Sequence, residues 1–140
     1  MHTKTLFLAA ALLAAPLPAM AQGQAPQAQG ALQVQINAAQ VSARAGSRNI
    51  GSIEEIHRRI QSSINCLVGP ADVDFKADFP NPCATTGKGV IPEHPDAGRK
   101  ARFREAVAKL KGILAMDDRK IAMEAALETA DMIAAISEGN

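Results

Sequence analysis

Residues 96–137 read DAGRKARFREAVAKLKGILAMDDRKIAMEAALETADMIAAIS, and this stretch decides the fold class. Its first half has an acidic first turn followed by apolar residues at helical spacing. This pattern predicts a helix from about 96 to 116 with an apolar face formed by Phe103, Val107, Leu110 and Leu114. Its second half predicts another helix over 119–137, which Asp117 or Asp118 can cap. Because only a tight turn separates the two, we expect an antiparallel helical hairpin.

The helix predicted over 119–137 has few polar positions. Apart from an acidic stripe of Glu124, Glu128 and Asp131, almost all of its residues are apolar or small. A helix that is apolar most of the way round is central or packs against more than one neighbour. Its surface is therefore expected to be covered by another helix of this chain or by a partner.

A further helix is predicted over 52–67, before the hairpin. Apolar side chains recur on one of its faces at helical spacing, namely Ile53, Ile56, Ile60, Ile64 and Leu67. Gly69 and Pro70 end it. We therefore expect a mainly all-α fold, with three helices in a small domain of residues 52–140.

Residues 1–21 have the three parts of a secretory signal peptide. They comprise a short basic start, an apolar run over 6–15 and small residues before a cleavage site after Ala21. The apolar run is too short to span a membrane, and no later segment is long and apolar enough to do so. We therefore expect a bacterial protein that is periplasmic or secreted.

Residues 22–51 are predicted to form a low-complexity or extended N-terminal segment. Residues 22–30, QGQAPQAQG, can bury little apolar surface and are expected to be disordered. Residues 31–37, ALQVQIN, alternate apolar and polar side chains, which predicts a short half-buried strand or an extended coil. No second alternating run is evident to pair with this segment.

The only two cysteines, Cys66 and Cys83, are expected to form a disulfide in an oxidising compartment. The disulfide would staple the long connection over 68–95, which is rich in proline and glycine. Connections of this length are usually functional or disordered, and a staple argues against full disorder. We therefore place the possible binding residues in this loop, namely Asp72, Asp74, Phe75, Phe79, Lys88 and His94.

No metal site, cofactor or catalytic residue is predicted. The acidic residues around Asp74 lack the glycine that an EF-hand calcium loop requires. A metal held by His57, Glu93 and His94 would need separate parts of the chain to fold together. No nucleophile or acid–base pair has a recognisable setting, so we expect a protein that is not an enzyme.

Composition narrows the function further. Without residues 1–21 the chain has 14 basic residues (15 less Lys4) and 14 acidic ones, which argues against a nucleic-acid partner. Trp and Tyr are absent, so aromatic stacking platforms are lacking. We expect a small non-enzymatic protein that binds a protein partner, or forms a homodimer, through helix 119–137. The alternative is a small-ligand or metal-binding protein that uses loop 68–95.

Overall fold

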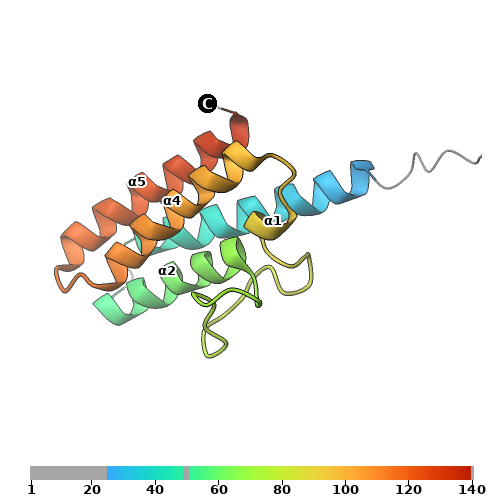
Figure 1. Ribbon diagram of the computed structural model, residues 1–140. Coiled ribbons are helices and arrows are strands. Elements are labelled where there is room, and N and C mark those ends of the chain that lie inside the picture. The colour runs from blue at the N-terminus through green and yellow to red at the C-terminus, as the bar shows by residue number, and fades with distance from the viewer. Residues whose placement is uncertain (1–24, 49–50, 140) are drawn as a thin grey trace, which may run out of the picture.

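The computed structural model describes residues 25–48 and 51–139, and these residues are mainly helical (Figure 1). The long helices are α1 (Ala25–Gly46), α2 (Ile53–Val68), α4 (Ala97–Leu114) and α5 (Arg119–Glu138). The long connection after α2 holds one short helix, α3 (Val90–Glu93). The described ranges contain no strand. The mainly helical class is thus confirmed, and α2, α4 and α5 lie at the positions predicted from the sequence.

The prediction for the N-terminal segment was wrong, because residues 25–46 form α1 and neither a disordered segment nor a strand over 31–37. Leu32 and Ile36 fit a period of two, yet they also lie four residues apart on one helical face. Ala39 and Ala43 continue that face and are fully buried, while Val34 points outward and is 51% exposed. The alternation of apolar and polar residues over 31–37 was therefore too short to distinguish the period of a strand from that of a helix. Residues 22–24 lie outside the described ranges.

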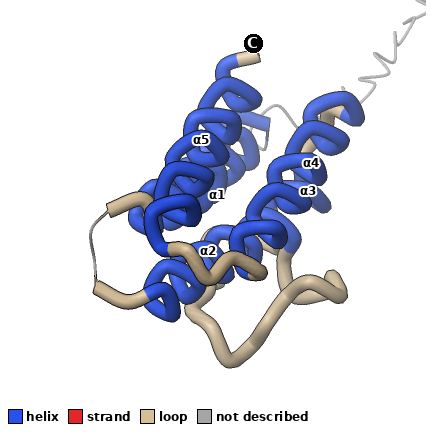
Figure 2. Tube along the Cα trace, turned by 90° about the vertical axis from the view of Figure 1, so that its left-hand side faces the viewer, coloured by secondary structure: helices blue, strands red, loops and turns tan. Residues whose placement is uncertain are grey.

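Helix α1 packs against α2 and α5, and it runs beside α5 in both views (Figures 1 and 2). Small residues are prominent on the buried faces of both helices. Ala39 and Ala43 of α1 and Ala126 and Ala130 of α5 are all fully buried. Short side chains allow helix backbones to approach closely, so an alanine-rich face needs a neighbouring helix to bury it. Much of the surplus apolar surface expected on helix 119–137 is covered by α1, which was missing from the predicted three-helix arrangement.

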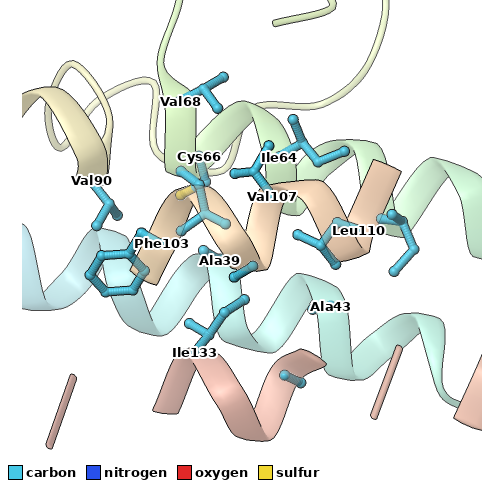
Figure 3. Close-up of a cluster of buried hydrophobic side chains, with 14 of the residues drawn as sticks. Ala39, Ala43, Ile64, Cys66, Val68, Val90, Phe103, Val107, Leu110 and Ile133 are labelled. Carbon is cyan, nitrogen blue, oxygen red and sulfur yellow. The ribbon is translucent and has the colours of Figure 1, made fainter. Parts of the chain in front are cut away.

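The core lies where all four long helices meet (Figure 3). Ala39 and Ala43 of α1 lie between Ile133 of α5 and side chains of α2 and α4, among them Phe103 and Leu110. Phe103 is the largest fully buried side chain. Since the chain lacks Trp and Tyr, aliphatic residues and this phenylalanine supply most of the buried apolar surface.

Helices α4 and α5 start at side-chain caps and are in contact with each other. Asp96 accepts a hydrogen bond from the backbone amide of Arg99, and Asp118 accepts one from Ile121. Such caps satisfy amides that have no partner within the helix. The guanidinium of Arg99, in the first turn of α4, donates to the carbonyl oxygen of Ser137 near the end of α5, at 3.4 Å.

The predicted signal peptide and its cleavage site after Ala21 lie outside the described residues. Within the described part of the chain, no helix is both long enough and apolar enough to cross a membrane.

Candidate functional site

The predicted disulfide is present and ties the last turn of α2 to the long loop. Cys66 and Cys83 are bonded, with their Cα atoms 5.2 Å apart, and both are buried. The two sulfur atoms lie 3.3 Å and 3.5 Å from the backbone carbonyl oxygen of Gln35 in α1. The staple thus sits against the N-terminal helix, at the point where α1, α2 and the loop converge.

Asn65 of α2 fixes the first half of the loop through backbone atoms. Its side-chain amide donates to the carbonyl oxygen of Lys76 at 2.9 Å, and to those of Phe79 and Pro80 at 3.3 Å. Its side-chain oxygen accepts a hydrogen bond from the Lys76 amide at 2.9 Å. Gln61, one helical turn earlier, donates to Asn65 Oδ1 and to the carbonyl oxygen of Asp74, both at 3.0 Å. We call these two side chains the amide clamp.

The two acidic candidates of the loop form ion pairs with α4. Asp74 lies 2.5 Å from the ammonium group of Lys111, and Asp72 lies 3.9 Å from the guanidinium of Arg104. Asp72 also accepts a hydrogen bond from the backbone amide of Asp74. Both carboxylates are therefore occupied by contacts that position the loop on α4.

The apolar candidates of the loop divide into an inner and an outer group. Phe75 is half-buried and packs against the core, whereas Phe79 is 38% exposed. Val73, which sequence reasoning did not single out, is 87% exposed. Val73 and Phe79 therefore present apolar surface to solvent. The amide clamp and the ion pairs hold the residues around them in place.

Residues 87–93 are held by Gln35, a fully buried side chain of α1 that sequence reasoning missed. Gln35 Nε2 donates to the Glu93 carboxylate at 2.7 Å, and its Oε1 accepts from the amide of Gly89 at 3.0 Å. The other Glu93 oxygen accepts from the amide of Lys88 at 2.9 Å. Residue Lys88 is exposed, and only its backbone enters this network. A polar residue on the buried face of α1 is the signal that would have identified Gln35, once α1 itself was recognised as a helix.

His94 is buried just before α4. Its Nδ1 accepts a hydrogen bond from the Asp96 amide at 3.1 Å, and its ring centroid lies 5.7 Å from that of Phe103. Burial lowers the pKa of His94 below its ordinary value of 6.5. A neutral imidazole that accepts at Nδ1 carries its proton on Nε2.

His57 and His94 are not brought together. His57 Nε2 lies 3.1 Å from the carbonyl oxygen of Met116, beyond the C-terminal end of α4, whereas His94 precedes the helix. The 18 residues of α4 span about 27 Å at 1.5 Å each, too far for one metal ion to join both ends. Across the described residues, no group of three His, Cys, Asp or Glu side chains is placed to hold a metal.

A cavity of about 320 Å³ lies beside His94, between α1, the start of α4 and the end of α5. Its lining combines the apolar Leu32 and Ile36 of α1 with polar residues, namely Gln29, Gln33, His94, Asp96, Arg99 and Ser137. A second hollow of about 240 Å³ shares Leu32 with it and also includes Ala28 and Glu93. Of the six predicted binding residues, His94 is the one that lines the larger cavity, while Asp72 and Asp74 lie against α4.

No known protein-family model, curated protein or solved structure matches this chain.

Proposed function

We propose that the protein is non-enzymatic and acts by binding a protein partner through loop 70–83. The observation that carries the proposal is the exposed Val73, 87% accessible on a loop that the rest of the fold holds in place. Single exposed apolar side chains are common on protein surfaces. What favours a role for Val73 is the number of contacts that order the segment around it.

Three kinds of contact order this loop before any partner arrives. The disulfide fixes Cys83, the amide clamp holds the backbone at Lys76, and an ion pair joins Asp74 to α4. A loop that is already ordered loses less conformational entropy on association, so more of its contact energy is available for binding. Loops held on a rigid scaffold are also where binding residues concentrate.

The interface expected from the sequence, helix 119–137, receives less support than the loop. In α5 the residues Ile121 and Leu127 are 54% and 44% exposed, while the alanine face packs on α1. We keep a homodimer or partner contact through α5, as part of an antiparallel hairpin with α4, as the weaker form of the proposal. Light scattering coupled to size exclusion tests the homodimer directly, since a monomer at all concentrations would contradict it.

We further propose that the protein works in the periplasm or outside the cell after cleavage behind Ala21. The Cys66–Cys83 disulfide and the lack of a membrane-spanning helix among the described residues are compatible with that location. The mass of the protein purified from its natural source tests the cleavage. A mass that still includes residues 1–21 would contradict the proposal.

A substitution pair tests the loop as the binding surface. Val73→Ser removes the exposed apolar group of the loop, and Val41→Ser removes a matched valine, 64% exposed, on α1. Tagged wild-type protein and both variants are cross-linked in periplasmic extract, and the captured proteins are identified by mass spectrometry. We expect one protein captured by the wild type and by Val41→Ser, and its loss with Val73→Ser. Equal capture by all three, or no specific capture, would contradict the proposal.

A second candidate function, binding of a small ligand, is favoured by the cavity beside His94. The cavity lies within the size range of small-molecule sites, and it combines an apolar wall with a few polar groups, as such sites do. A thermal-shift screen against small metabolites tests it, and a flat response to every compound would count against it.

A further inference from the structure

The cavity beside His94 contains two opposite charges on one helical turn. Asp96 is the N-cap of α4 and Arg99 follows three residues later, and both line the cavity. Residues three apart at a helix are neighbours, with about 5–6 Å between their Cβ atoms. A ligand that enters the cavity can therefore contact both a carboxylate and a guanidinium.

Both groups keep donors or acceptors for a ligand. A guanidinium carries five N–H donors, and the bond from Arg99 Nη1 to Ser137 uses one of them. Asp96 accepts the amide of Arg99, and this bond is the main reason that the pKa of its carboxyl lies below the ordinary value. The carboxylate is therefore charged at neutral pH, and an ionised carboxylate can accept further hydrogen bonds.

His94 adds a neutral donor to the same cavity. The residue is 4% exposed, and its Nδ1 is occupied by the Asp96 amide. Among the described residues, Nε2 has no hydrogen-bond partner. It is also not completely shielded from solvent. His94 lines the cavity, and Nε2 is the ring nitrogen that keeps its donor for a ligand.

The α1 side of the cavity is uncharged, and it contributes apolar side chains as well as the amides of Gln29 and Gln33. Leu32 and Ile36 of α1 line it, together with Pro95, and the adjoining hollow continues past Ala28. This side of the cavity can cover an aliphatic group but supplies no charge. The cavity thus combines a positive group, a negative group, a neutral donor and an apolar surface.

We propose that this cavity binds a free α-amino acid with an aliphatic side chain, an inference that rests on the small-ligand function. The ligand carboxylate pairs with Arg99 and takes a hydrogen bond from His94, and the ligand ammonium pairs with Asp96. The aliphatic side chain packs on Leu32 and Ile36. A ligand with only a carboxylate would be repelled by Asp96, and a ligand with only an ammonium group would be repelled by Arg99. A zwitterion can pair with both side chains and therefore fits this site better than either.

Three ligands of nearly the same shape test the charge requirement on the unmodified protein. L-Leucine carries both charges, 4-methylpentanoate lacks the ammonium, and 3-methylbutylamine lacks the carboxylate. Isothermal titration is expected to give leucine an affinity about tenfold or more above either analogue, because each analogue loses one charge-assisted contact and keeps one repulsion. Equal affinity for all three would overturn the proposal while leaving small-ligand binding intact. No binding of leucine, isoleucine or methionine up to about 10 mM would also overturn it.

Two substitutions separate recognition from a structural role. Asp96→Asn removes the charge but keeps the cap, because asparagine is an equally good N-cap residue. It is expected to weaken leucine binding and to leave 4-methylpentanoate binding unchanged or stronger. Arg99→Gln is expected to weaken leucine binding and to favour the amine. Circular dichroism checks that each variant is folded. A parallel loss for all three ligands in folded variants would contradict the assigned roles.

Discussion

Removal of the Asn65 side chain is expected to loosen the loop and to destabilise the whole protein. Asn65→Ala deletes the centre of the amide clamp, a side chain that is fully buried. The two contacts with the backbone of Lys76, at 2.9 Å, and the contact with Gln61, at 3.0 Å, are lost together. The two longer contacts at 3.3 Å, with Phe79 and Pro80, are lost as well.

The magnitude follows from these contacts. A well-formed hydrogen bond contributes about 1 kcal/mol net, so the three short bonds together contribute about 3 kcal/mol. Lys76 is exposed, so water can replace part of the loss at the loop backbone. Gln61 is buried, and one of its two amide N–H groups loses its partner while the other still donates to Asp74, which raises the cost. We therefore expect Asn65→Ala to lower the free energy of unfolding by about 2–4 kcal/mol, a large part of the ~5–15 kcal/mol that is usual for a folded domain.

Equilibrium unfolding in urea, followed by far-ultraviolet circular dichroism, measures this loss. The matched control is Asn37→Ala on the exposed face of α1, where the side chain accepts one hydrogen bond, from Gln33. The control is expected to change stability by less than about 0.5 kcal/mol. Trypsin cleavage after Lys76 should also become faster in Asn65→Ala than in the control. A variant as stable and as resistant to trypsin as the control would refute the role given to the clamp.

Two further predictions concern Gln35 and His94. Gly87→Ala should destabilise the protein, because a Cβ atom at this position would overlap the side chains of Gln35 and Glu93. Gly112→Ala, a helical site with open space around it, should stabilise it by about 0.5–1 kcal/mol, and the same sign at both sites in urea unfolding would contradict this. For His94, burial lowers the pKa of the folded state below 6.5, so the unfolded chain binds more protons as the pH falls. Stability should decrease below about pH 6.5, and a pH slope unchanged in His94→Asn would disprove the assignment.

The sequence was sufficient to predict the helices whose apolar faces are made of large side chains. Helix α2 has a row of isoleucines, and α4 has Phe103 and Leu110, so their helical period is clear. Helix α1 was missed because its buried face depends largely on Ala39 and Ala43, which add little to a hydrophobic pattern. Helical pairing of small residues becomes recognisable only when the partner helix is known, and here that partner is the alanine face of α5.

The sequence indicated one residue of the candidate site but not the residues that surround it. The disulfide followed from the presence of two cysteines in a chain expected to be exported, and the position of the long loop followed from its proline and glycine content. His94 was among the predicted binding residues, but Asp96 and Arg99 were not. Gln35 was not identified, because it belongs to the helix that was mistaken for an extended segment. Contacts between segments far apart in the sequence carry no local periodic signal, and this accounts for both omissions.

Recognition of α1 also changes where a partner is expected to bind. An alanine face on α5 suggests an interface only if no helix of the same chain covers it, and α1 does cover it. The same helix supplies Leu32 and Ile36 to the cavity beside His94, and Gln35 to the network at residues 87–93. A change in the position of α1 would therefore alter the core and the cavity together. The part of the loop around Val73 is anchored to α2 and α4, and only the end of the loop, at Cys83, lies against α1. Binding at the loop and binding in the cavity are accordingly expected to be independent, and a partner that contacts Val73 should leave the affinity for leucine unchanged.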